Sequence, residues 1–267
     1  MIEKLGIVLS GGGIRGIAHI GLLQALKENG IEPDYIAGAS AGALVGAMYA
    51  AGYGPEESLE LFRKTPLFKW SNYNLSRGKP GLFDSEKYSK YFLNYLPENS
   101  FKALQKRLFV AVTDICEGCW KILDRGPLIS SLLASSALPP VFSPVVIDGV
   151  FYADGGIMNN FPLEPLEGLC HKIIGSHASP IRKVSSESLG NSFNLIQRSY
   201  ELNLHVQTFQ KYHRCNYVFS PDELYPFGML NTGELEKVYQ IGYEKALEQM
   251  PAIKMALGYQ EGGRMAS

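Results

Sequence analysis

The sequence has no long hydrophobic run. No stretch approaches the roughly 20 apolar residues that a membrane-spanning helix needs. The first apolar run, 5–9, is also too short for the core of a signal peptide. From these absences we expect a cytoplasmic protein whose contact with a membrane is at most peripheral, on the inner face.

Neither charge sign is in excess, and cysteine is scarce. Lys and Arg number 25 against 26 Asp and Glu, for a formal net charge of −1. Nucleic-acid binding calls for a basic face, so the overall charge argues against a nucleic-acid partner. Four cysteines in 267 residues do not make a disulfide framework. Cys116-x-x-Cys119 has no second pair, so we expect neither a metal nor another cofactor.

Glycine is abundant, with 28 residues, and two clusters lie close together near the N-terminus. The first is Gly11-Gly12-Gly13-Ile14-Arg15-Gly16, and the second is Gly38-Ala39-Ser40-Ala41-Gly42. Small residues around a serine allow a sharp strand-to-helix turn that exposes the hydroxyl. A glycine-rich loop can direct backbone N–H groups at a developing negative charge. Together they indicate a serine hydrolase that still lacks a base.

The hydrophobic pattern predicts an α/β fold. Short strands at 5–9 and 35–37 each lead into one of the glycine clusters, and helices at 17–29 and 41–51 follow them. This order predicts a parallel sheet with helices on its faces. Farther along, we expect helices at 84–96, 128–138, 193–211 and 234–249, and strands at 107–115, 120–123, 145–147, 150–152, 173–175 and 217–219. No linker or repeat interrupts the pattern, so we expect one domain over 1–257 and a flexible tail at 258–267.

The base must be found elsewhere in the chain, because a serine hydroxyl is a poor nucleophile until its proton is removed. None of the five histidines lies in a recognisable loop motif. Asp154, in Ala153-Asp154-Gly155-Gly156, is the better candidate, since two glycines after an acid allow a tight turn. Taken alone, Asp-Gly-Gly is an ordinary turn. Asp154 becomes a candidate base because the same chain also contains the two glycine clusters.

These three motifs, in this order and spacing, resemble the patatin-like phospholipase family. The resemblance covers most of the chain and includes the segments 136–142 and 159–162. It implies a three-layer α/β/α fold with a mainly parallel central sheet. It also implies hydrolysis of lipid acyl esters through an acyl-enzyme, by a Ser–Asp dyad without a histidine. Pro140 stands where members of the family often have glycine, which concerns only the local loop.

The resemblance assigns roles residue by residue. Ser40 would be the nucleophile and Asp154 the base, the amides of Gly12 and Gly13 would form the oxyanion hole, and Arg15 would sit beside it. The supporting residues would be Gly11, Gly16, Gly38, Gly42, Gly155, Gly156 and Asn160. Asn160 either supports the Asp154 loop through its side chain or simply makes a turn.

Other functions fit parts of the same pattern. Gly11-x-Gly13-x-x-Gly16 matches a dinucleotide-binding loop, but Asp34 precedes the second strand instead of ending it. A histidine-triad hydrolase could use His171, His177, His205 or His213, although that fold lays down several strands before its nucleophile. A Ser–His acyltransferase would carry histidine beside the serine, where this chain has Ala39. A non-catalytic lipid-binding or regulatory protein stays open.

The natural ester is not set by the sequence. Phospholipid, lysophospholipid, neutral glyceride and simple carboxylic ester are all compatible with the motifs, because pocket shape decides among them. The aromatic and basic residues of 68–79 suggest either a lipid-facing flap or a loop packed on the core.

Overall fold

A mainly parallel sheet forms the centre of the molecule. The computed structural model describes residues 3–65, 80–228 and 232–259. Its strands are β1 (Leu5–Leu9), β2 (Tyr35–Ala39), β3 (Arg107–Asp114), β4 (Cys119–Leu123), β5 (Val145–Ile147), β6 (Val150–Asp154), β7 (Lys172–Ser176) and β8 (Tyr217–Phe219). Within these ranges hydrogen-bonded pairs connect the strands in the sequence β5-β6-β3-β2-β1-β7-β8, and β4 also pairs with β3. The pairs among β8, β7, β1, β2 and β3 are parallel, while β4, β5 and β6 pair antiparallel.

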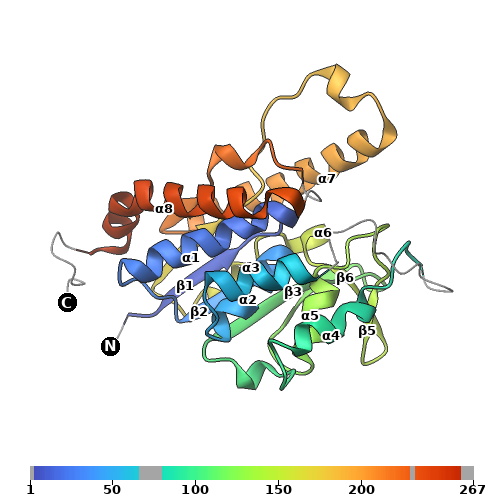
Figure 1. Ribbon diagram of the computed structural model, residues 1–267, viewed down its shortest axis with the longest axis horizontal. Helices are drawn as coiled ribbons and strands as arrows, with labels where there is room; N and C mark the ends of the chain where they lie inside the picture. The colour runs from blue at the N-terminus through green and yellow to red at the C-terminus, as the bar shows by residue number, and fades with distance from the viewer. Residues whose placement is uncertain (1–2, 66–79, 229–231, 260–267) are drawn as a thin grey trace.

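Helices connect and cover these strands, which confirms the predicted α/β class. They are α1 (Ala18–Glu28), α2 (Ala41–Ala50), α3 (Pro55–Lys64), α4 (Ser89–Leu93), α5 (Leu128–Ser135), α6 (Gly156–Asn159), α7 (Ser192–Phe209) and α8 (Leu235–Leu257). Figure 1 shows α1 and α8 side by side across one face of the sheet. None of the described helices combines the length and the apolar content needed to cross a bilayer.

The sheet separates two cores of unequal size, because side chains alternate between its faces. Ile7 pairs with Ile36, and both are buried in the larger core, which α1, α2, α5 and α8 complete. The next pair along the strands, Val8 and Ala37, turns to the opposite face. There the segment 161–166 covers it with Phe161, Leu163 and Leu166.

The register of β3 determines where the two predicted catalytic segments lie. β2 ends at Ala39, opposite Ala111, and β6 ends at Asp154, opposite Val112. β4 pairs with β3 over Val110–Asp114, so β2 and β6 must both occupy the other edge of β3. They run toward each other along that edge. The residue after β2 therefore arrives beside the last residue of β6.

Three helices differ from the sequence pattern, and the one predicted over 128–138 ends early, at Ser135. The helix predicted over 84–96 begins as a 3-10 turn, Ser85–Tyr88, which the Asp84 carboxylate caps by accepting the N–H of Glu86 at 3.2 Å. The last helix does not end at 249 but continues through Pro251 to Leu257. Met250, Ile253 and Leu257 are buried, so packing of this final stretch outweighs the helix-breaking effect of proline. Gly258 then ends the helix with a φ of 83°.

The crossing of α1 and α8 brings two backbones into contact. A Cβ added at Gly21 would lie 2.4 Å from both the Tyr239 carbonyl oxygen and the Tyr243 nitrogen. A Cβ added at Gly242 would lie 2.2 Å from the Ala18 carbonyl oxygen. Real side chains do not approach backbone atoms this closely. Only glycine at these two positions allows the helices to pack at this distance.

We therefore expect Gly21→Ala to lower the free energy of unfolding by about 1–3 kcal/mol, since the added methyl group forces the two helices apart. Urea unfolding followed by circular dichroism measures this change. Lys27→Ala, at an exposed position of the same helix, is the control and should change the free energy by less than about 0.5 kcal/mol. An unchanged midpoint for Gly21→Ala would contradict the close crossing.

Candidate active site

Ser40 occupies a strained turn between β2 and α2. Its φ of 51° and ψ of −125° are unusual for a residue with a side chain. The turn is also tight. A Cβ at Gly42 would lie 2.2 Å from the Leu9 carbonyl oxygen, and one at Gly38 would lie 2.7 Å from the nitrogen of Ala43. The small residues on both sides of Ser40 are therefore a steric requirement of the turn, as the motif predicts.

Ser135, at the end of α5, fastens this turn to the sheet. The N–H of Ser40 donates to Ser135 Oγ at 2.9 Å, and Ser135 Oγ donates to the Ala111 carbonyl oxygen at 2.6 Å. The second bond is short, and the Ser135 side chain is fully buried. The sequence motifs do not point to this serine, because it lies far from Ser40 along the chain and belongs to a helix with no motif of its own.

Asp154 faces Ser40 across the shared edge of β3. Ser40 Oγ donates to Asp154 Oδ2 at 2.8 Å, and the N–H of Gly156 donates to Oδ1 at 2.7 Å. The Thr113 hydroxyl holds the Asp154 carbonyl at 2.9 Å. A Cβ at Gly155 would lie 2.2 Å from the Ala111 carbonyl oxygen, so the chain can leave β6 here only as glycine. The two residues predicted to form a dyad are in direct contact.

Tyr200, on the inner side of α7, is a third donor to the Asp154 carboxylate. Its hydroxyl also packs against Gly156, where a Cβ would lie 2.9 Å away. Burial and the nearby carboxylate raise the pKa of Tyr200 well above its usual value, so the phenol keeps its proton and donates it. Sequence reasoning missed this residue, because a tyrosine in a long helix carries no signal of such a contact.

Burial governs the acidity of Asp154. The side chain is 2% exposed, and its desolvation raises the pKa of the carboxyl to about 7. Hydrogen bonds from Ser40, Gly156 and Tyr200 oppose this rise, and no charged side chain is among the groups that shift the pKa. A carboxyl with this pKa is ionised in part at neutral pH and is a far stronger base than an exposed aspartate.

The glycine loop lies next to the Ser40 hydroxyl. Gly12 and Gly13 both line the hollow that contains Ser40 and Asp154. Gly13 has a φ of 58° and begins a 3-10 turn, so its N–H and that of Gly12 come before the first bonded turn. Within the described part of the chain, neither N–H has an acceptor. Both residues therefore carry an unpaired backbone donor at the wall of the hollow that contains Ser40.

Much of the remaining wall of the hollow is apolar. Leu138, Val141 and Phe142 form one side, and Leu204 of α7 forms another. The hollow has a volume of about 30 Å³, which is room for a water molecule or two but not for an acyl chain.

Two buried polar atoms in this wall are without a partner among the described residues. Asn160 donates through Nδ2 to Thr208 Oγ1 at 3.1 Å, but its Oδ1 accepts no hydrogen bond. Thr208 already donates its own hydroxyl to Leu204, which explains why Asn160 presents the amide nitrogen to it. Ser136 Oγ is the second unpartnered atom. Unpaired polar atoms beside a reactive serine are available to a substrate or a water.

Arg15 lies in the glycine loop but its side chain does not line the hollow. Its guanidinium donates to Glu201 on α7 at 3.0 Å and to the Phe227 carbonyl oxygen at 2.6 Å. The residue thus anchors α7 and the 225–227 segment, instead of standing beside the free amides. Gly16, the last glycine of the loop, packs against Ala41, where a Cβ would lie 2.6 Å from the alanine Cβ.

The five histidines, all within the described ranges, are absent from the lining of the hollow. His19 bonds Ser176 Oγ at 2.7 Å and the Ser10 carbonyl oxygen at 2.9 Å. His177 bonds the Tyr212 hydroxyl at 2.5 Å. Burial lowers the pKa of His19 to about 4 and that of His177 to about 3, so both are neutral at pH 7. The geometry does not favour a histidine triad around Ser40.

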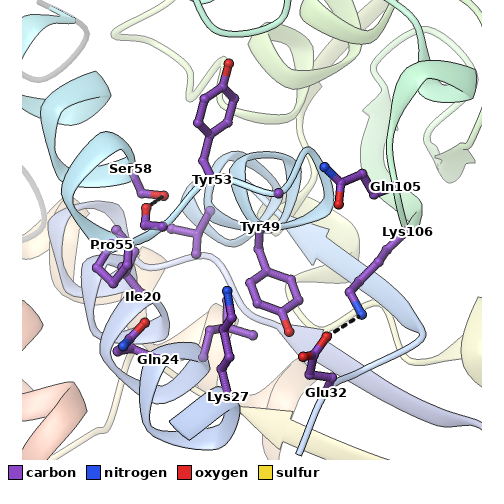
Figure 2. A pocket seen from close by; sticks show the side chains of 14 residues that line it. Ile20, Gln24, Lys27, Glu32, Tyr49, Tyr53, Pro55, Ser58, Gln105 and Lys106 are labelled. Carbon is purple, nitrogen blue, oxygen red and sulfur yellow. Dashed lines mark hydrogen bonds and ion pairs between the residues drawn. The ribbon is translucent and has the colours of Figure 1, made fainter.

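A second hollow, of about 130 Å³, lies at the opposite end of β2 and α2 (Figure 2). There Lys106 pairs with Glu32 at 3.2 Å, and the Tyr49 ring lies beside this pair. Ser58 also lines this hollow, but its hydroxyl donates to the Gly54 carbonyl oxygen at 2.8 Å and faces no base. This hollow has no equivalent of the Ser40–Asp154 contact.

Two further expectations from the sequence concern metal binding and the segment 68–79. Across residues 3–65, 80–228 and 232–259, no three His, Cys, Asp or Glu side chains converge as metal ligands would. The segment 68–79, for which the sequence suggests a lipid-facing flap or a packed loop, lies outside the described residues.

The chain is similar in sequence to known proteins. A family model for patatin-like phospholipases matches residues 7–167. An NTE family protein of Mycobacterium tuberculosis is 30% identical over 204 residues, which are 73% of this chain and 56% of that protein. The neuropathy target esterase of Drosophila melanogaster is 33% identical over 177 residues, which are 62% of this chain and 12% of that protein. The chain thus spans little more than half of the mycobacterial relative.

The fold has a solved counterpart. VipD from Legionella pneumophila superposes with a TM-score of 0.53 at 16% identity, over 94% of this chain and 67% of VipD. At this identity the likeness concerns the fold alone. It agrees with an α/β architecture organised around the sheet described above.

The strain at Ser40 predicts how two substitutions there change the free energy of unfolding. Ser40→Gly and Ser40→Ala both remove the hydroxyl, but only glycine adopts a φ of 51° without strain. We expect Ser40→Gly to exceed Ser40→Ala by about 1 kcal/mol in free energy of unfolding, because relief of about 1–3 kcal/mol of strain outweighs glycine's extra chain entropy. Urea unfolding of the two variants measures the difference.

The control is the same pair of substitutions at Ser199, an exposed position inside α7. There the order should reverse, with alanine more stable than glycine by about 1 kcal/mol. If alanine is also the more stable residue at position 40, the turn is not strained.

Proposed function

The chain belongs to the patatin-like phospholipase family, and on this basis we propose that it hydrolyses carboxylic esters of lipids with Ser40 as nucleophile and Asp154 as base. The observation that carries the proposal is the 2.8 Å hydrogen bond from Ser40 Oγ to the buried Asp154 carboxylate. Two further features of the hollow support the proposal. The amides of Gly12 and Gly13 are unpaired, and apolar side chains form much of the wall.

Acylation begins with the transfer of one proton. Asp154 Oδ2 accepts the hydrogen of Ser40 Oγ as the oxygen attacks the ester carbonyl carbon. The carbonyl oxygen becomes an anion, and the C–O bond to the alcohol then breaks. Asp154 returns the proton to the leaving alkoxide, so the alcohol departs neutral and Ser40 holds the acyl group.

The N–H groups of Gly12 and Gly13 stabilise the oxyanion in this proposal. They are the unpaired backbone donors that share the hollow with Ser40. Donors of this kind contribute more than in water, since the site is small and mostly apolar. Removing one such donor from comparable sites costs about 2.7–4 kcal/mol of barrier.

Deacylation repeats the same steps with water. Asp154 takes a proton from a water molecule as the water oxygen attacks the acyl carbon. The proton then passes from Asp154 to Ser40 Oγ as the carboxylic acid is released. The unpaired Asn160 Oδ1 and Ser136 Oγ are acceptors that can orient such a water within the hollow.

A lone aspartate can act as the base because of its surroundings. An exposed aspartate has a pKa of about 3.9 and binds a proton weakly at pH 7. Burial brings the pKa of Asp154 to about 7, close to the pH at which the protein would work. A histidine is therefore not required between the serine and the acid.

The dyad is tested by Ser40→Ala and Asp154→Asn, each of which should reduce hydrolysis of a short p-nitrophenyl ester by about 10³-fold or more. Ser40→Ala removes the nucleophile, and Asp154→Asn replaces the carboxylate that accepts its proton at 2.8 Å with an amide that is not a base. His205→Ala and His177→Ala are the controls and should leave the rate near that of the wild type. Circular dichroism confirms that each variant is folded.

Two outcomes would contradict the dyad. Full activity of either dyad variant would exclude it, and loss of activity in a histidine variant of normal fold would favour a triad. Labelling of Ser40 by a fluorophosphonate separates a hydrolase from a non-catalytic binding protein on the same fold.

The pH dependence tests the buried carboxylate and Tyr200 together. Asp154 must be ionised to accept a proton, so kcat/KM should fall about tenfold per pH unit below its pKa of about 7. Tyr200→Phe removes one of three donors to the carboxylate, which destabilises the ionised form and raises its pKa. We expect the acidic limb to move to higher pH by about one unit.

The control is Tyr212→Phe, which removes a phenol that bonds His177 and lies outside the lining of the hollow. Its profile should match that of the wild type. A Tyr200→Phe profile with an unmoved acidic limb would mean that the tyrosine supports the fold and not the carboxylate.

A further inference from the structure

Helix α7 turns its apolar side chains toward solvent. Leu195, Leu202, Val206 and Phe209 are 52%, 45%, 52% and 60% exposed. They fall on one stripe of the helix, since α-helices repeat every 3.6 residues. Ile196, which is 64% exposed, borders the stripe. We call these five residues the outer stripe.

The opposite side of α7 is held to the body largely by polar contacts. Gln207 donates to the Ile157 carbonyl oxygen at 3.0 Å, and Glu201 accepts from Arg15 at 3.0 Å. This is the reverse of the usual surface helix, which buries its apolar side and exposes its polar side. α7 and the loop before it project from the body at the upper right of Figure 1.

The outer stripe carries no charge. Arg198 and Glu201 are the charged side chains of α7. They are only 13% and 10% exposed, and they lie 3.7 Å from each other. Exposed apolar surface without charge is suited to the hydrocarbon region of a lipid layer and unsuited to water.

The helix that bears this stripe is also a wall of the Ser40 hollow. Tyr200 and Leu204 line the hollow from the side of α7 that lies about half a turn from the stripe. The hollow, at about 30 Å³, cannot hold an acyl chain. The stripe and the hollow are separated by one helix diameter, about 10 Å. Whatever binds the stripe therefore lies against the same helix that lines the hollow.

Exposed apolar side chains on other segments flank the same hollow. Leu82 is 50% exposed, and its N–H donates at 3.0 Å to the carbonyl oxygen of Pro140, next to Val141 in the wall. Met158, 38% exposed, lies on α6 directly after Ile157, the residue to which α7 is bonded. Exposed apolar side chains near the site are thus not confined to α7.

We propose that α7 docks on a lipid bilayer, with the outer stripe in the acyl region of the leaflet that it meets. The inference rests on the proposed function in one respect, since a lipid ester is the substrate that this hollow would draw from the bilayer. A zwitterionic bilayer suffices as the partner, because the stripe binds by burial of apolar area and not by charge.

Docking is tested by sedimentation with phosphatidylcholine vesicles in a Ser40→Ala background, where no lipid is consumed. The added pair Leu202→Gln and Val206→Gln should weaken vesicle binding by about tenfold or more, since two side chains no longer enter the acyl region. The matched control is Leu247→Gln with Met255→Gln on α8, which are 38% and 80% exposed and lie outside the lining of the hollow. The control should bind as its parent does, and binding should depend little on salt.

A second measurement separates docking from catalysis. In the protein with Ser40 intact, the α7 pair should leave hydrolysis of a soluble short ester unchanged and reduce hydrolysis of vesicle lipid by about tenfold. Vesicle binding through the stripe without any ester hydrolysis would support docking and overturn the proposed function. Ester hydrolysis with vesicle binding that the α7 pair leaves unchanged would overturn docking alone.

Analytical ultracentrifugation tests whether a second copy of the chain covers the stripe instead of a bilayer. If the wild type is a dimer and the α7 pair a monomer, a second copy of the chain covers the stripe, and docking on lipid is overturned. A monomer in both cases leaves the stripe free for the bilayer and supports the proposal.

Discussion

The edge of β3 on which β2 and β6 meet is the constraint on which the site depends. Two strands that end opposite neighbouring residues, Ala111 and Val112, bring Ser40 and Asp154 together without a long side chain or a mobile loop. The glycines beside them follow from the same geometry. Where a Cβ would lie 2.2 Å from a backbone oxygen, as at Gly42 and Gly155, no other residue lets the chain turn at that point.

A buried acid without a cationic partner gives this site its chemistry. Taking Asp154 out of water makes its ionised form less stable, and the hydrogen bonds from Ser40, Gly156 and Tyr200 restore only part of that stability. The carboxyl is left with a pKa near neutrality. A fully paired aspartate, such as one beside an arginine, would be a poor base. Arg15 belongs to the glycine loop that borders the hollow, but its guanidinium pairs with Glu201.

α7 connects the site to the surface of the molecule. Its inner side carries Tyr200 to the carboxylate and Leu204 to the hollow, and its outer stripe meets solvent. Because the helix is held largely by hydrogen bonds, its position depends on fewer buried apolar contacts than that of α1 or α8. Low local stability is typical of elements that move when a ligand or a surface binds.

The sequence by itself determined the α/β order, most helix and strand positions, and the three motifs that contain Ser40, Asp154 and the glycine loop. Those features are local, since turn chemistry and hydrophobic period are written in neighbouring residues. The span 1–257 as one domain stays a prediction. The tertiary structure alone decided that Ser135 and Tyr200 touch the dyad, that Arg15 turns away, and that α8 continues through Pro251. Each of these depends on burial against residues distant in the chain, which no local pattern records.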